Sequence, residues 1–339
     1  MNNQSFLMNN SVSSRKPLVT IIIPAYNSSD FILDAVNSIV IPGTCDAEVI
    51  IIDDGSTDDT MNVINCHFSV SEMIKVIAVP NGGVSRARNI GIQNARGEFI
   101  CFLDSDDQLE PNFLSILIQN ARENKVDVQL CGYYKHYINN IDKQPKSCYE
   151  SQLLLRYLSG DVSFHIGSML IKKSFIDRNN IKFNEDLFLG EDILFICQLL
   201  ALAECKMSLD YLYHHNYRKD SLTTSKWSDD DYLHDIYAMQ TLKKEINKIY
   251  KGQDRIEVFN KLTESIINRK IRYLWKLFLS KKYNSLKELC DAGFLDSQEY
   301  TQAKKLPIKY RKRVIIFKLN NITLWKMIRL FNFKKAKVL

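Results

Sequence analysis

Four short runs of consecutive apolar residues, rich in valine and isoleucine, recur in the first third of the chain. They are 19–23, 48–52, 74–79 and 98–103. Continuous apolar runs of this length predict strands buried on both faces, as parallel strands are. Between and after them, apolar residues recur at helical spacing over 31–40, 57–66, 85–95 and 111–123. Strands that alternate with helices predict an α/β fold, with helices on both faces of a mostly parallel sheet.

The alternation weakens from about residue 126. Further strands are predicted at 128–134, 163–171 and 207–213, with helices at 174–179 and from 190, and a polar insertion at 138–148. After residue 225 the chain is helical and highly charged, as in 231–250 and 257–279. The pattern therefore predicts a strand-containing part followed by a helical C-terminal region.

Polar clusters follow three of the predicted strands directly. They are Pro24-Ala25-Tyr26-Asn27, Asp53-Asp54-Gly55-Ser56 and Asp104-Ser105-Asp106-Asp107. Each cluster alone could be a turn or a helix cap, with Asp107 capping the next helix. In parallel sheets, however, ligands bind at the carboxyl ends of strands. Neighbouring carboxylates repel one another unless a cation neutralises them, so the three clusters together favour one shared site with a divalent metal such as Mg²⁺ or Mn²⁺.

Arg88 lies in the first turn of a predicted helix, against the dipole preference, so it indicates a nearby anion or is a surface arginine. Other polar residues lie where structural roles are common. Glu191 and Asp192 begin a predicted helix, as acidic caps do. His165 has the context of a hydrogen-bonded core histidine. His214, His215, Arg218 and Ser221 directly follow the last predicted strand.

Four segments in this order, 20–27, 52–58, 81–91 and 97–107, resemble glycosyltransferase family 2, and Gly190-Glu191-Asp192 extends the resemblance. The resemblance implies a GT-A fold and an inverting transferase that uses Mn²⁺ or Mg²⁺. It implies transfer of one sugar from a nucleotide-sugar donor, expected to be a UDP-sugar, to a hydroxyl of a glycan or lipid-linked glycan acceptor. Cell-surface polysaccharide synthesis is the expected setting.

The resemblance also implies roles for individual residues. The nucleotide would be bound by Pro24, Tyr26, Asn27, Asp53, Asp54, Arg88, Asp104, Ser105, Arg218 and Ser221. The metal would be bound by Asp106, with Asp104 and His215 as further ligands. Asp192 would be the general base, and Glu191 and His165 would contact the acceptor. One carboxylate base suffices because inversion is a single displacement, and the metal stabilises the leaving diphosphate.

The expected organisation is a flexible tail over 1–16, a GT-A catalytic domain over 17–225, and a helical region over 226–339. Within the catalytic domain, 17–125 would bind the nucleotide sugar and 126–225 would supply the acceptor side and the base. The alternatives are a nucleotidyltransferase, whose glycine-rich, lysine-bearing phosphate loop is missing, and a non-catalytic sugar-nucleotide or membrane-binding protein. The retained Asp104, Asp106 and Asp192 argue against the latter.

Charge is distributed unevenly along the 339 residues. The net charge is +6, but residues 300–339 contain 12 Lys and Arg and no acidic residue, which leaves a net −6 in 1–299. The basic tail 304–339 mixes these cations with apolar residues, and Leu324, Met327, Ile328 and Phe331 would share one helical face. This composition is typical of a helix on an anionic membrane surface, with a packed helix or an oligomer contact as alternatives.

The sequence also suggests a location and argues against one class of partner. The tail resembles no known nucleic-acid-binding module, so nucleic-acid binding is not expected. No signal-peptide pattern and no apolar run of about 18 residues is found. We therefore expect a cytoplasmic protein, with a peripheral position on the inner face of the cytoplasmic membrane as the alternative that the tail raises.

Overall fold

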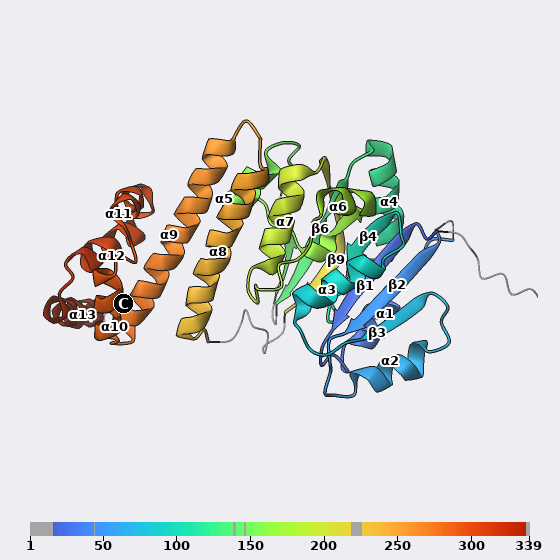
Figure 1. Cartoon of the computed structure of the whole chain (residues 1–339), viewed down its shortest axis with the longest axis horizontal. Coiled ribbons are helices and arrows are strands. Elements are labelled where there is room, and N and C mark those ends of the chain that lie inside the picture. The colour runs from blue at the N-terminus through green and yellow to red at the C-terminus, as the bar shows by residue number, and fades with distance from the viewer. Residues whose placement is uncertain (1–15, 44, 138–139, 146, 218–225, 337–339) are drawn as a thin grey trace, which may run out of the picture. The chain divides into compact units, whose positions relative to one another are not determined.

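The computed structural model describes residues 16–43, 45–137, 140–145, 147–217 and 226–336 (Figure 1). Contacts divide the chain into two compact units that interleave along the sequence. The first unit comprises 1–148, 164–182 and 203–216, and the second comprises 149–163, 183–202 and 217–339. Each unit has its own elements and core. The functional boundaries expected from the sequence stay a prediction.

The first unit contains the predicted parallel strands. They are β1 (Val19–Ala25), β2 (Ala47–Asp53), β3 (Ile74–Ala78) and β4 (Phe99–Phe102), in the order β3-β2-β1-β4. The helices that follow these strands are α1 (Ile32–Asn37), α2 (Thr60–Phe68), α3 (Val84–Asn94) and α4 (Phe113–Asn124). Adjacent strands in this half pair in parallel throughout. Pro24 lies inside β1 opposite Ile52 rather than ending the strand.

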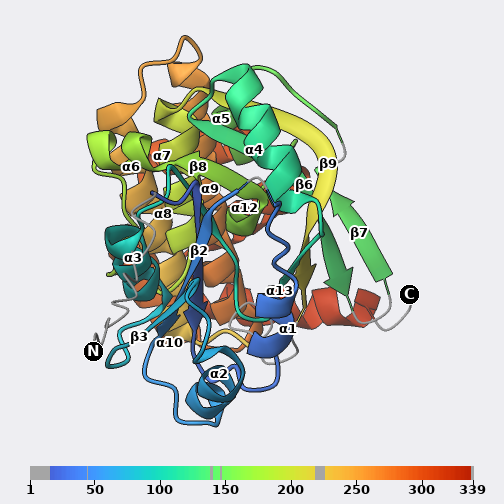
Figure 2. The same ribbon diagram turned by 90° about the vertical axis from the view of Figure 1, so that its right-hand side faces the viewer.

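The other half of the sheet is mixed. It contains β5 (Gln108–Leu109), β6 (Val128–Tyr137), β7 (Asn140–Gln144), β8 (Met169–Lys172) and β9 (Cys205–Asn216), with the 3₁₀ turn η1 (Ile166–Ser168) and α6 (Lys173–Asn179) beside β8. β8 is antiparallel to both β4 and β6, whereas β6 and β9 are parallel. The polar stretch expected as an insertion contains β7, which pairs with β6 at the edge of the sheet (Figure 2). The expected α/β class is confirmed, and its parallel part is confined to one half and the β6–β9 pair.

Alternating side chains of β1 explain why helices cover both faces of the parallel half. Ile21 and Ile23 belong to the core that includes residues of α1 and α4. Ile22, between them, faces α3, since a Cβ added to Gly91 of α3 would lie 2.3 Å from its Cγ2. Successive strand residues point to opposite faces, so one isoleucine run is buried on both sides. Apolar burial on both faces fixes the strand ends that the polar clusters follow.

The second unit is helical. Its elements are α5 (Leu153–Ser159), α7 (Glu191–Leu202), α8 (Asp229–Ile249), α9 (Arg255–Leu279), α10 (Tyr283–Asp291), α11 (Ser297–Gln302), η2 (Ala303–Lys305), α12 (Ile308–Lys318) and α13 (Ile322–Ala336). α8 begins with a capping box between Ser228 and Asp231. None of the helices in the described ranges has the length and apolar character needed to cross a bilayer.

Part of the basic tail packs into the core of this helical unit. Val314, Phe317 and Trp325 are buried among side chains of α9 and α10. The indole N–H of Trp325 donates to the Ile316 carbonyl oxygen at 2.7 Å. The packing interpretation therefore applies to these residues. The membrane interpretation stays a prediction for the exposed side chains of the tail.

Candidate active site

The ends of β1 and β2 are joined by side-chain hydrogen bonds. Asn27 has a left-handed backbone conformation, with φ of 47°. Its N–H donates to Ser56 Oγ at 3.0 Å, and its Oδ1 accepts from the Thr57 N–H at 2.8 Å. Asp53, buried at the end of β2, accepts from the Ser56 N–H at 3.4 Å. These bonds fix both loops, while Tyr26 remains 49% exposed beside them.

Asp54 organises the turn that precedes α3. Its side chain is buried, and its two carboxylate oxygens accept from the N–H groups of Gly82 and Gly83 at 2.9 and 2.8 Å. Its carbonyl oxygen accepts from the Asn81 side chain at 2.9 Å. Asp54 thus links the end of β2 to the start of α3. Its role in binding a nucleotide base stays a prediction.

The anion beside Arg88, in the first turns of α3, is a carboxylate of the chain itself. The guanidinium is almost fully buried and lies 2.8 Å from Asp104 Oδ1. His165 Nε2 lies 3.9 Å from the other oxygen of Asp104. Burial would raise the pKa of the Asp104 carboxyl, but the charges of Arg88 and His165 keep that pKa below its usual value. Asp104 is therefore an ionised, oriented carboxylate at the end of β4.

The four residues of the acidic cluster have separate environments. Ser105 is buried, and its Oγ lies 2.7 Å from Ser28 Oγ. Asp106 is half-buried, and its carbonyl oxygen accepts from the Asn216 side chain at 2.8 Å. Asp107 is 1% exposed. The expectation that Asp107 caps the next helix is wrong, because Asn112 has the N-cap position of α4 and the Asp107 carboxylate accepts from β9 instead.

β9 supplies the donors to Asp107 by strand alternation. The hydroxyl of Tyr213 donates to Asp107 Oδ2 at 2.6 Å, and His215 Nδ1 lies 3.3 Å from the same oxygen. The Asn216 N–H donates to Oδ1 at 2.8 Å. The side chain of His214, between them, points the other way, and its Nε2 lies 2.7 Å from Glu110. Residues two apart in a strand share a face, so Tyr213 and His215 converge on one carboxylate.

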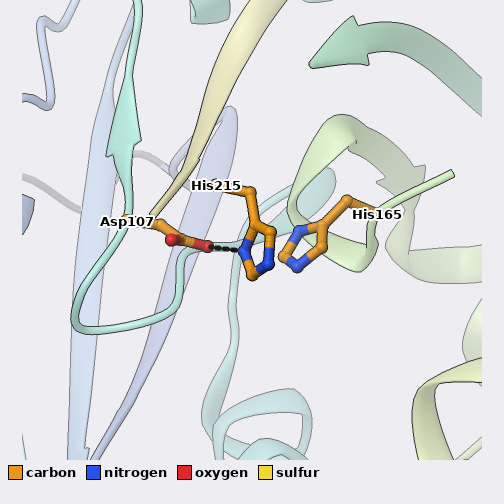
Figure 3. Close-up of side chains that lie close together, drawn as sticks. All are labelled: Asp107, His165 and His215. Atoms are coloured by element: carbon orange, nitrogen blue, oxygen red, sulfur yellow. Dashed lines mark hydrogen bonds and ion pairs between the residues drawn. The ribbon is translucent and has the colours of Figure 1, made fainter. Parts of the chain in front are cut away.

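Asp107, His165 and His215 form a group whose ligand atoms all lie within 4.8 Å of one another (Figure 3). The rings of His165 and His215 are 4.6 Å apart between centroids. Nδ1 of His165 accepts from the Gly167 N–H at 3.2 Å, which fixes the orientation of the ring. Burial would lower the pKa of His215, but its hydrogen bond to Asp107 raises that pKa overall. One carboxylate and two imidazoles are a donor set that can bind a divalent metal.

Tyr213 also supports His165. The two rings stack at 4.9 Å between centroids. A Cβ at residue 167 would lie 2.1 Å from Cε2 of Tyr213, so only glycine leaves room for that ring. Tyr213 and Asp107 were not expected from the sequence as site residues. The sequence signal was the Tyr213-His214-His215 run at the end of the predicted strand 207–213. β9 continues through this run, so alternation places the tyrosine and the second histidine on one face.

The other expected site residues are distributed as follows. The first unit brings Arg88, Asp104, His165 and His215 together, as the contacts above show. Glu191 and Asp192 form the first turn of α7 in the second unit, where Asp192 Oδ1 accepts from the Ile193 N–H at 2.7 Å. Arg218 and Ser221 lie outside the described residues. The roles given to all these residues stay predictions.

Comparison with known proteins identifies the family. The model of "Glycosyl transferase family 2" matches residues 20–186, from β1 to just beyond α6. EpsJ of Bacillus subtilis, named an uncharacterized glycosyltransferase, is 30% identical over 59% of this chain and 62% of its own length. A poly(ribitol-phosphate) beta-glucosyltransferase of Bacillus spizizenii is 32% identical over 60% of this chain and 32% of its own length. The chain thus spans less than two thirds of either relative.

A solved structure extends the likeness to the fold. S. aureus TarS 1–349, in complex with UDP-GlcNAc, matches with a TM-score of 0.68 and 23% identity, covering 92% of this chain and 91% of that one. This likeness confirms the expected GT-A fold with a helical C-terminal region. The matched family model covers the parallel strands β1 to β4, the loops that follow them and the Asp104–Asp107 cluster, and it ends before β9. Residues 20–186 of this chain thus form a domain of glycosyltransferase family 2.

Proposed function

We propose that this chain is an inverting, metal-dependent glycosyltransferase that moves one sugar from a UDP-sugar to a hydroxyl of a glycan or lipid-linked glycan. The observation that carries the proposal is the arrangement at the ends of the sheet strands. There, the Arg88–Asp104 pair lies beside the Asp107, His165 and His215 group. Binding of UDP-GlcNAc by TarS and the polymer glucosylation named for the Bacillus spizizenii relative support the donor and acceptor classes.

The donor set of the site fits a divalent metal. Asp107, His165 and His215 offer one oxygen and two nitrogens, and Asp106 directly precedes Asp107 in the sequence. Imidazole nitrogen disfavours Mg²⁺, which prefers oxygen ligands, so we propose Mn²⁺ for this site. Asp106 and Asp104 complete the proposed ligand set, as the family motif implies. When bound, the metal neutralises negative charge on the departing diphosphate.

The residues around the strand ends have proposed roles in holding the nucleotide. Pro24 lies inside β1, and Tyr26 and Asn27 follow that strand. Asp53 is the last residue of β2 and Asp54 follows it, and hydrogen bonds fix Asn27 and Asp54. The exposed ring of Tyr26 offers a surface on which a base can stack. Asp104, oriented by Arg88, can accept a ribose hydroxyl hydrogen. Rigid loops of this kind reduce the ordering cost of binding.

Asp192 is the proposed general base. The acceptor hydroxyl oxygen attacks the anomeric carbon and forms the new C–O bond as the bond from that carbon to the diphosphate oxygen breaks. The hydroxyl proton passes to the Asp192 carboxylate, and UDP leaves with the electron pair of the broken bond. General-base assistance of this kind contributes about 10²–10⁴-fold to the rate. Glu191, its neighbour in the first turn of α7, has a proposed role in contacting the acceptor.

Thermal shift with UDP and Mn²⁺, combined with a transfer assay, tests the proposal. UDP should stabilise the wild type in Mn²⁺ and less so in Mg²⁺. Asp106→Ala should lose the metal-dependent shift, whereas Asp210→Ala, at an exposed position on β9, should keep it. Asp192→Asn should keep the shift and lose transfer by at least roughly 100-fold. An unchanged shift in Asp106→Ala would remove the metal assignment, and near-normal transfer by Asp192→Asn would place the base elsewhere.

A peripheral position on the inner face of the cytoplasmic membrane is part of the proposal. A lipid-linked acceptor lies at such a surface, and the cations of 304–339 would be attracted by anionic lipids. Association of the full chain with vesicles containing phosphatidylglycerol, and its weakening by salt, is the measurement that tests it.

A further inference from the structure

α12 has apolar residues on two opposite faces. Val314 and Phe317 are buried in the helical core. Ile308, Ile315 and Leu319 are 63%, 61% and 45% exposed. At about 100° per residue these three fall within one narrow stripe, roughly opposite the buried pair. α12 therefore presents an apolar stripe to solvent after its inner face has already been packed.

Cations border this stripe on both sides. Helical geometry places Lys309 and Lys312 on one side of it, and Arg311 and Lys318 on the other. All four are exposed. No acidic residue occurs anywhere in 300–339 to neutralise them. A stripe of large apolar side chains between two rows of cations is the pattern of a helix that lies in the interface of an anionic bilayer.

We propose that the outer face of α12, formed by Ile308, Ile315 and Leu319 with the flanking cations, is the surface through which this protein binds an anionic lipid bilayer. The apolar stripe enters the headgroup region, and the four cations contact lipid phosphates. A second copy of the chain fits this surface less well, because two such faces would bring like charges together without acidic partners. The inference rests on the proposed membrane association and specifies its surface.

The outer face of α12 differs from the membrane face that the apolar periodicity of the sequence predicts. Leu324, Met327, Ile328 and Phe331 would have formed the membrane face on periodicity alone. In the structure, Ile328 packs partly against the helical core, and the neighbouring Trp325 is fully buried. The exposed face of α12 is thus the better-defined candidate, because its inner side is already occupied by the core.

Vesicle co-sedimentation of the full chain tests the surface directly. The probes are vesicles of phosphatidylcholine with and without phosphatidylglycerol, without donor or metal, so that binding is independent of transfer. The double variant Ile308→Gln and Ile315→Gln should lower partitioning onto anionic vesicles by at least roughly tenfold. Ile256→Gln, at a 77% exposed position in α9, is the matched control and should change nothing.

The charge arm uses Lys309→Gln with Lys312→Gln, which should weaken binding by roughly tenfold and reduce its salt dependence. Lys244→Gln with Lys251→Gln, both at exposed positions, is the control. If the wild type binds anionic vesicles and both α12 variants bind them equally well, this surface is refuted and the membrane proposal stands. Failure of the wild type to bind anionic vesicles would refute both. A dimer in sedimentation velocity that the isoleucine variant dissociates, without vesicle binding, would assign the stripe to a second copy.

Discussion

Removal of one hydroxyl group, in Tyr213→Phe, should disturb the candidate site more than its size suggests. The hydroxyl donates to the buried Asp107 carboxylate at 2.6 Å and accepts from the Asp104 N–H at 3.4 Å. Burial and the charge of Asp107 raise the pKa of Tyr213 well above its usual value, so the hydroxyl remains a donor at neutral pH. Phenylalanine keeps the ring that stacks on His165.

The magnitude follows from the partner's charge and burial. A hydrogen bond to a charged group contributes about 1.5–3 kcal/mol, and a buried acceptor that loses its donor keeps its desolvation cost. Asp107 is 1% exposed, so water cannot replace the hydroxyl without rearrangement. We expect the free energy of unfolding to fall by about 2–3 kcal/mol. Because Tyr213 orients a proposed metal-binding carboxylate, Mn²⁺ affinity should fall by roughly tenfold or more.

Urea unfolding and calorimetric titration with Mn²⁺ measure the two effects. Tyr211→Phe is the matched control, since that hydroxyl, on the same strand, donates at 2.9 Å to the neutral Pro145 carbonyl oxygen. Its loss should cost about 0.5–1.5 kcal/mol and leave Mn²⁺ affinity unchanged. If Tyr213→Phe were no more destabilising than Tyr211→Phe and bound Mn²⁺ normally, the argument that Tyr213 orients Asp107 would be refuted.

Two further predictions concern the same site. Gly167→Ala places a Cβ 2.1 Å from the Tyr213 ring and should lower the free energy of unfolding by about 1–3 kcal/mol. The control is Gly43→Ala, whose Cβ would enter open space and should change that free energy little. Equal effects of the two variants in urea unfolding would contradict the packing argument. Arg88→Gln should cost about 3 kcal/mol at neutral pH, the low end for a broken ion pair, because Asp104 retains some exposure. The pKa of Asp104 is lower in the folded protein than in the unfolded chain. The stabilisation that Arg88 provides is therefore fully present above the pKa of Asp104 in the unfolded chain, and it is lost as the pH falls through the pKa of Asp104 in the folded protein. The wild-type advantage over Arg88→Gln should therefore shrink below about pH 4, and a constant difference down to pH 2 would contradict it.

Local pattern was sufficient for the parallel half of the fold. A continuous β-branched run such as 19–23 favours a strand covered on both faces, and the polar residues that follow it then lie at the carboxyl end of the sheet. Arg88 was recognised as out of place in the first turns of α3 because a cation opposes the helix dipole there. The partner that explains it, Asp104, needed the structure.

The residues that complete the site depended on pairings over long distances in the chain. Tyr213 reaches Asp107 across 106 positions, through the register between β5 and β9. That register is set by packing over the whole sheet, so no local periodicity reports it. His165 joins the group because η1 and β8 lie between β4 and β6.

By itself, the sequence determined where the parallel strands, the helices between them and the strand-end carboxylates lie. A strand buried on both faces is apolar throughout, and a helix buried on one face has apolar residues at a repeat of about 3.6. Only the tertiary structure decided which side chains meet Asp107. It also decided which of the two apolar faces of α12 remains exposed. Periodicity records that a face is apolar, but whether a core or solvent lies against that face is settled only when distant parts of the chain pack together.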